Sequence, residues 1–119
     1  MSYPALPHIG GNYNTVTFSG HSAGCQFSET MQIIHSSIIK GSVLMECGPY
    51  SEDLPDYHAK GVTTDELVAR AEKVLDANAQ SKVIDDPSHL SDAAIYLVGG
   101  TEDTTVPLLA VEGVDKLLT

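Results

Sequence analysis

The fold of this chain is decided by the stretch Thr15-Val16-Thr17-Phe18-Ser19-Gly20-His21-Ser22-Ala23-Gly24. Residues 15–18 are β-branched or aromatic, which is typical of a strand. Residues 23–36 are predicted to form a helix directly after it. The glycines at 20 and 24 would let strand and helix pack closely, so the stretch predicts a tight turn with strained backbone at Ser22.

The rest of the chain continues this alternation of strands and helices. In the first helix Phe27, Met31 and Ile34 fall near one face. The later elements are predicted at residues 42–45 (strand), 63–79 (helix), 94–98 (strand) and from Pro107 onward (helix). The capping-box spacing of Thr63 and Glu66 marks the start of the second helix. Residues 1–13 and 48–62, which are rich in Pro, Gly or polar residues, are expected to be irregular.

Alternating strands and helices indicate parallel β-α-β units, so the predicted fold class is α/β. The strands at 42–45 and 94–98 lack polar alternation, which favours burial on both faces, as in a parallel sheet. We therefore expect one domain over residues 1–119 with a small parallel sheet flanked by helices. Three strands make an unusually small sheet, so the domain is expected to be incomplete.

Composition excludes some classes of partner. The chain of 119 residues has 6 Lys and Arg against 16 Asp and Glu, a formal net charge of −10. Nucleic acid binding needs clustered cations, so it is excluded. No apolar run approaches the roughly 20 residues that a membrane helix needs. Residues 1–7 do not resemble a signal peptide, so either the chain is intracellular or a leader was removed, and the compartment stays open.

Two cysteines, Cys25 and Cys47, are predicted to be free thiols because no secretory signal indicates an oxidising compartment. Their spacing fits no zinc pattern. No metal and no cofactor are expected.

Gly20-His21-Ser22-Ala23-Gly24 has the G-x-S-x-G pattern of the nucleophile elbow found in α/β-hydrolases. There, Ser22 would be the nucleophile and the Ala23 amide would donate to the oxyanion. Asp103 follows the third strand and is the candidate triad acid, with Glu102 as a weaker competitor. The alternatives are a glycine-rich turn with an incidental serine and, for Asp103, a carboxylate favoured by a helix N-terminus.

Three segments resemble polyhydroxybutyrate depolymerases: residues 16–24, Glu46-Cys47-Gly48-Pro49-Tyr50, and Asp86-Pro87-Ser88-His89-Leu90 leading to the third strand. The resemblance covers roughly residues 12–110 and is closest to the circularly permuted branch, in which the nucleophile lies near the N-terminus. It implies a partial α/β-hydrolase fold and a serine esterase that cleaves poly(3-hydroxybutyrate) or smaller esters. It also implies Ser22, Asp103 and the Ala23 amide as site groups, without metal or cofactor. Members of the family are often secreted.

The family's catalytic histidine follows the acid, whereas every histidine here precedes Asp103: His8, His21, His35, His58 and His89. Each of the five is expected to be a solvent-exposed or packed side chain. Loss of a triad member costs on the order of 10⁶ in turnover, so the chain alone is expected to be nearly inert.

Two main functions remain open. The chain is either an esterase domain whose remaining strands and histidine lie elsewhere, or a silent hydrolase remnant that serves as a structural subunit. A small-molecule binder is a third alternative. In each case the strand around residues 16–18 would have an open edge, which predicts packing against another polypeptide or self-association along that edge.

Overall fold

The computed structural model describes residues 4, 5, 7–53 and 55–119. Its elements are β1 (Val16–His21), α1 (Ala23–Ile34), β2 (Ile39–Met45), α2 (Thr64–Gln80), β3 (Ala94–Val98) and α3 (Leu108–Leu118), with 3-10 turns at Tyr13–Thr15 and Pro87–Asp92. The predicted order of strands and helices is confirmed. The irregular segments expected at 1–13 and 48–62 include residues 1–3, 6 and 54, which lie outside the described residues.

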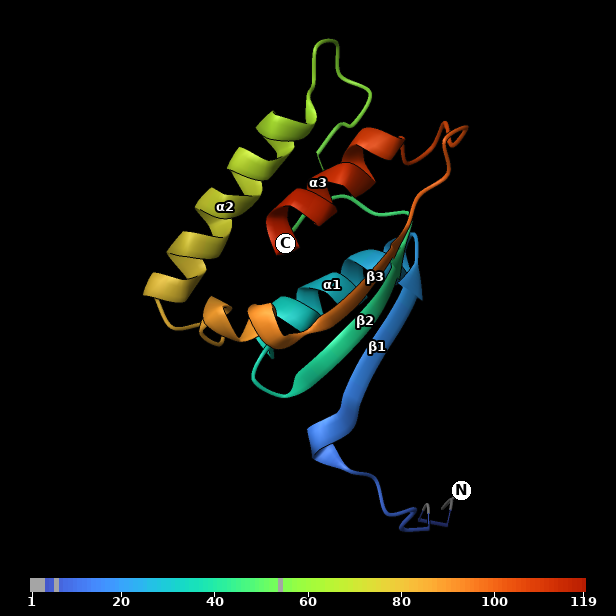
Figure 1. Ribbon diagram of the computed structural model, residues 1–119, viewed down its shortest axis with the longest axis vertical. Coiled ribbons are helices and arrows are strands. Elements are labelled where there is room, and N and C mark those ends of the chain that lie inside the picture. The colour runs from blue at the N-terminus through green and yellow to red at the C-terminus, as the bar shows by residue number, and fades with distance from the viewer. Residues whose placement is uncertain (1–3, 6, 54) are drawn as a thin grey trace.

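The three strands form one parallel sheet in the order β1-β2-β3 (Figure 1). At its carboxyl edge His21 pairs with Met45, and Met45 pairs with Val98. Because all strands run the same way, the segments that follow them meet at that one edge. The α/β class and the small parallel sheet are therefore confirmed.

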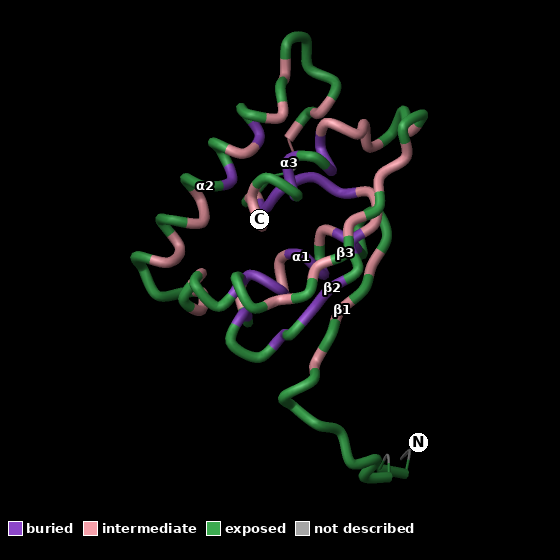
Figure 2. Tube along the Cα trace, in the orientation of Figure 1, coloured by how far each residue is buried: buried purple, intermediate pink, exposed green. Residues whose placement is uncertain are grey.

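One face of the sheet is not covered by the described residues. Burial alternates along β1 and β3, with residues 17, 19 and 21 and residues 94, 96 and 98 exposed. Val43, in the central strand, is 37% exposed, and Tyr96 beside it is 68% exposed. The expected burial of the second and third strands on both faces is wrong. Helices α1 and α3 pack against the opposite face, so only alternate side chains of the strands are protected (Figure 2).

Two clusters form the core beneath the helices. The first cluster contains Cys25 of α1, Leu44 of β2, Cys47 just after β2, and Val114 of α3. The second contains Ile33, Tyr50 and Leu90.

The buried face of α1 is polar, contrary to the apolar stripe expected from the sequence. Its buried residues are Cys25, Ser28, Glu29, Gln32 and Ile33. Phe27 is 58% exposed, although its ring lies 6.2 Å from that of Phe18. Buried amides and carboxyls must be hydrogen-bonded, and these are. The amide of Gln32 donates to the Ile39 carbonyl at 3.1 Å and accepts from the Ser42 hydroxyl at 2.6 Å.

Glu29 is the most unusual of these buried groups. Its carboxyl accepts hydrogen bonds from the Tyr50 amide and the Gln26 side chain, both at 3.0 Å. Burial raises the pKa of Glu29 to about 8, so the side chain is mostly neutral at pH 7. Helix α1 is thus joined through Glu29 to the loop that follows β2.

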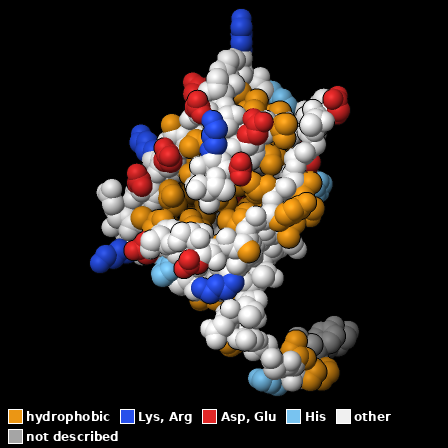
Figure 3. Space-filling model, viewed as in Figure 1, with side chains coloured by type: hydrophobic (Ala, Val, Ile, Leu, Met, Phe, Trp, Pro, Cys, Tyr) orange, Lys and Arg blue, Asp and Glu red, His pale blue; other side chains and the backbone are white. Residues whose placement is uncertain are grey.

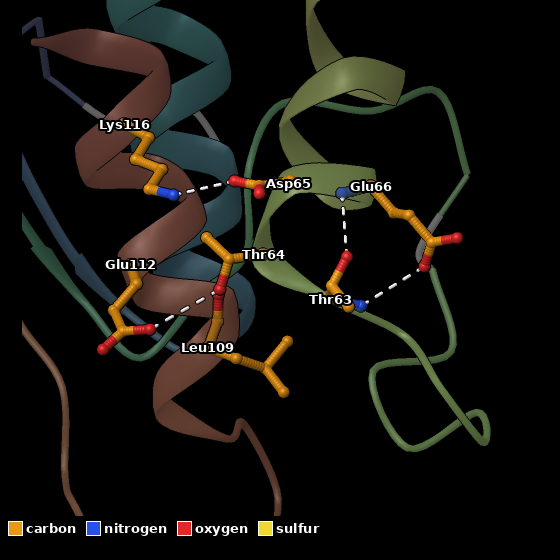
Figure 4. A network of polar contacts seen from close by, with 7 residues as sticks. All are labelled: Thr63, Thr64, Asp65, Glu66, Leu109, Glu112 and Lys116. Atoms are coloured by element: carbon orange, nitrogen blue, oxygen red, sulfur yellow. Dashed lines mark hydrogen bonds and ion pairs between the residues drawn. The ribbon is translucent and has the colours of Figure 1, made fainter.

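Polar contacts join the first turn of α2 to α3 (Figure 4), where the Thr64 hydroxyl donates to the Leu109 carbonyl at 3.2 Å. The predicted capping box is confirmed: the Thr63 hydroxyl accepts from the Glu66 amide, and the Glu66 carboxylate accepts from the Thr63 amide. Lys116 of α3 contacts Asp65 of α2 at 2.7 Å. Both side chains are exposed, so this ion pair contributes little to stability.

Charged side chains gather over α2 and α3 in the view of Figure 3, and hydrophobic side chains reach the surface between and beside them. None of the described helices combines the length and the apolar character that crossing a membrane requires.

Candidate active site

Ser22 lies alone between the last residue of β1 and the first residue of α1. Its backbone has φ 56° and ψ −120°. A residue with a side chain rarely adopts positive φ, and such strain persists only where the surrounding structure imposes it. Here the Ser22 amide donates to the Met45 carbonyl at 2.9 Å, while its own carbonyl accepts from Gln26 at 3.1 Å. The strained strand-to-helix turn predicted at Ser22 is confirmed.

The two glycines of the turn play different roles. A Cβ at Gly20 would lie 2.0 Å from the Gly24 carbonyl oxygen and 2.7 Å from the Cys25 nitrogen, so only glycine allows this close approach. A Cβ at Gly24 would meet nothing within 4 Å. The expectation that both glycines are needed for packing is therefore correct for Gly20 and wrong for Gly24, which faces open space.

Cys25 and Cys47 form a disulfide, and the expectation of two free thiols is wrong. Cys25 lies in the first turn of α1 and Cys47 lies two residues beyond β2, with their Cα atoms 5.6 Å apart. Parallel strand order brings both to the same edge of the sheet, within the Cα range that a disulfide needs. The bond connects the helix that begins at the turn to one wall of the pocket beside Ser22.

That pocket has a volume of about 180 Å³ and opens beside the turn. Its walls come from four segments: the turn, α1, the end of β2 with its following loop, and the loop before α3. The lining residues are Ser22, Ala23, Gln26, Glu46, Cys47, Gly48, Tyr57 and Val106. Because Ala23 is the first residue of α1, its amide has no partner within the helix and is free to donate to a bound oxygen.

Asp103 lies in the loop between β3 and α3, at the same sheet edge as Ser22. One carboxylate oxygen accepts from the amides of Thr105 at 2.7 Å and Val106 at 3.0 Å. The hydrogen bond from the Val106 amide, followed by the one from Thr105, holds the pKa of Asp103 below its usual range. The Glu46 side chain and His21 lower this pKa further. The side chain is therefore ionised at neutral pH. The predicted position of Asp103 at the Ser22 edge is confirmed, and its role as triad acid stays a prediction.

Glu46 is a site residue that the sequence reasoning did not single out. It directly follows β2 and has a positive φ of 58°. Its amide donates to Val98 at 3.0 Å, and one carboxyl oxygen, Oε1, accepts from the Gly100 amide at 2.8 Å. The other oxygen, Oε2, is buried without a hydrogen-bond partner among the described residues. Its position in the sequence could have indicated it. Glu46 directly follows the central strand β2, just as Ser22 follows β1 and Asp103 lies in the loop after β3.

Tyr57 is a second residue that was missed. Its hydroxyl is buried at the pocket and has no hydrogen-bond partner in the described part of the chain. A Cβ at Gly48 would lie 2.2 Å from this oxygen, so the glycine lets the Tyr57 ring lie against the loop in this position. Burial, with a contribution from Glu29, raises the pKa of Tyr57 and keeps the hydroxyl protonated. It is a donor available to a ligand.

All five histidines are exposed, as expected. His58 approaches the acid loop, where Nε2 lies 3.2 Å from the Thr105 carbonyl oxygen. His21 ends β1 and is exposed with Thr17 and Ser19 on the uncovered face. Neither histidine lines the pocket beside Ser22. Among the described residues no group of three His, Cys, Asp or Glu side chains could hold a metal ion.

The chain was compared with family models, curated proteins and solved structures, and none of them matches it. The resemblance to polyhydroxybutyrate depolymerases thus depends on the sequence segments quoted above.

Proposed function

We propose that the protein is a serine ester hydrolase that acts through an acyl-enzyme on Ser22. The observation that carries this proposal is the backbone of Ser22. A serine at φ 56° on a strand-to-helix turn costs on the order of 1–3 kcal/mol, and such strain clusters at functional sites. The turn leaves the residue exposed beside a pocket and next to a free helix N-terminal amide.

The surrounding groups suit acyl transfer. The Ala23 amide is in place to stabilise the oxyanion that forms when Ser22 attacks an ester carbonyl. Asp103 provides an ionised carboxylate at the same edge.

The pocket favours a short acyl group as substrate. Its volume of about 180 Å³ is below the roughly 300–1,000 Å³ of pockets that hold drug-sized ligands, so it suits a small group. A hydroxybutyryl unit is such a group, and the Tyr57 hydroxyl could donate to one of its oxygens. This supports a substrate of the polyhydroxybutyrate class, or a small ester of similar acyl length.

Labelling with a fluorophosphonate tests the proposal. The intact chain is treated with the reagent, digested, and the adduct located by mass spectrometry. We expect modification at Ser22, its loss in Ser22→Ala, and full labelling in Ser19→Ala, which removes an exposed hydroxyl three residues away. Equal labelling of all three proteins, or of none, contradicts the proposal.

A second function is favoured by the uncovered sheet face, namely a silent hydrolase-like subunit that packs against another polypeptide. Parallel sheets are normally covered on both faces, and this face exposes Val43, Tyr96 and Val98. Stable association together with an unreactive Ser22 would favour this alternative over the enzyme.

A further inference from the structure

The strand register places Glu46 between the candidate nucleophile and the candidate acid. The ladder pairs His21 with Met45 and Met45 with Val98. Just beyond these pairs, the Ser22 amide donates to the Met45 carbonyl and the Glu46 amide donates to the Val98 carbonyl. Glu46 therefore stands at the end of the central strand, with the Ser22 turn on one side and the Asp103 loop on the other.

The side chain of Glu46 is held by a hydrogen bond to one carboxyl oxygen, and the other oxygen has no partner in the described structure. Oε1 accepts the Gly100 amide at 2.8 Å, which fixes the carboxyl group at the sheet edge. Oε2 is buried and has no partner in the described structure, although Glu46 lines the pocket that Ser22 also lines. An unpaired buried carboxyl oxygen is destabilising, so it calls for an explanation.

We propose that Glu46 is the general base for Ser22, with Asp103 behind it as the supporting carboxylate, in place of a histidine. This inference rests on the proposed ester hydrolase function. It explains the position of the unpaired oxygen and the absence of any histidine from the pocket, and it uses groups that this chain itself contains.

The reaction balances with water as the only co-reactant. Glu46 Oε2 accepts the proton of the Ser22 hydroxyl as Oγ bonds to the ester carbonyl carbon, and the Ala23 amide holds the resulting oxyanion. When the intermediate collapses, the bond to the alcohol oxygen breaks, and that oxygen takes the proton from Glu46. Glu46 then removes a proton from water, whose oxygen attacks the acyl carbon. The bond to Oγ breaks, and the proton returns to Ser22.

The hydrogen bond from Gly100 makes a clean variant possible. In Glu46→Gln the amide oxygen can still accept from Gly100, whereas the amide nitrogen takes the place of Oε2 and cannot accept a proton. We expect the rate of 4-nitrophenyl butyrate hydrolysis to fall by about 10²–10⁴-fold, the range typical of a general base, with KM little changed. Glu72→Gln, which neutralises an exposed carboxylate on α2 that does not line the pocket, is the matched control and should retain the wild-type rate.

A pH profile separates a carboxylate base from an imidazole base. The titratable groups around Glu46 are Tyr57, which lines the same pocket, and Asp103, whose pKa both Glu46 and His21 help to lower. His21→Gln and His58→Gln are therefore measured in parallel. We expect the acid limb of the wild-type Ser22-dependent rate to lie below the ordinary histidine range of about 6–7, and to stay there in both variants. This measurement also decides the question if Glu46→Gln does not fold, which thermal unfolding would reveal.

These outcomes separate the role of Glu46 from the proposed ester hydrolase function on which it rests. If wild-type protein neither hydrolyses the ester nor labels at Ser22, the proposed function fails and the inference fails with it. If Ser22 reacts but Glu46→Gln reacts equally fast, or loss of either histidine abolishes the rate, only the role of Glu46 is overturned.

Discussion

The substitution Gly20→Ala tests whether the turn at Ser22 depends on a backbone contact that only glycine allows. The added Cβ would lie 2.0 Å from the Gly24 carbonyl oxygen and 2.2 Å from its carbonyl carbon. Both atoms belong to the backbone of the first helical turn, so neither can move aside as the end of a flexible side chain could. Strand β1 and helix α1 would have to separate, and the backbone of Ser22 links the two.

The size of the effect can be bounded with a matched control. Overpacking of this kind costs about 1–3 kcal/mol and sometimes more, and here a backbone clash places it at or above the upper end. Gly24→Ala adds the same methyl group four residues later, inside α1, where nothing lies within 4 Å. Replacing glycine by alanine in a helix stabilises it by roughly 0.5–1 kcal/mol. The two variants should therefore shift the free energy of unfolding in opposite directions.

Chemical denaturation followed by circular dichroism gives both free energies, and fluorophosphonate labelling gives the reactivity of Ser22. We expect Gly20→Ala to be destabilised and unreactive, and Gly24→Ala to be at least as stable as wild type and still reactive. If Gly20→Ala were as stable as Gly24→Ala, the close approach of strand and helix would not be what holds the turn, and the reasoning would be refuted.

Three further predictions concern other parts of the molecule. Thiol titration of the denatured chain without reductant should detect no free thiol, and reducing the Cys25–Cys47 bond, which closes a loop of 22 residues, should cost about 3 kcal/mol of stability. Because the folded-state pKa of Glu29 is raised from 4.5 to about 8, its contribution to stability is fully present below pH 4.5 and is lost as pH rises towards 8. In Glu29→Gln this decline should be absent, so pH-dependent thermal melts of the two proteins should converge in acid and differ at pH 8. Tyr96→Ser should reduce any self-association measured by light scattering, since it removes the most exposed aromatic ring of the uncovered face.

The elements that could be predicted from the sequence are those with local signals. Thr63 and Glu66 form their capping box within one helical turn, and the predicted helix start needed no other part of the chain. The glycine at 20 and the strand before it likewise predict the turn at Ser22. In each case a contact between near neighbours in the sequence gives the signal: Thr63 with Glu66, and Gly20 with Gly24.

The parts that could not be predicted depend on contacts between distant segments. Periodicity places Phe27 on an apolar stripe, yet Glu29 and Gln32 are buried instead, because their polar groups meet Tyr50, Ile39 and Ser42. These contacts join α1 to the next strand and the loop after it, 7 to 21 residues away, and helical periodicity carries no information about them. The disulfide is a different case. Cys25 follows β1 and Cys47 follows β2, and the parallel pairing of these two strands brings both residues to one edge of the sheet.

Glu46 and a histidine from another polypeptide are the two candidates for the general base beside Ser22. Glu46 is anchored between the Ser22 turn and the Asp103 loop by its amide and by Oε1. An imidazole entering from outside would have to displace the carboxyl group, which would leave the Gly100 amide without its acceptor at a cost of about 1–3 kcal/mol. The alternative is that the imidazole binds beside Oε2, in which case Glu46 would orient it and the unpaired oxygen would gain its partner. A polypeptide that covers this face as far as Val98, the last residue of β3, would reach this edge. If the isolated chain hydrolyses esters through Glu46, whatever covers the sheet need contribute only packing. If it does not, either the covering polypeptide completes the site or the chain is a silent subunit, and labelling of Ser22 in the assembled complex distinguishes the two.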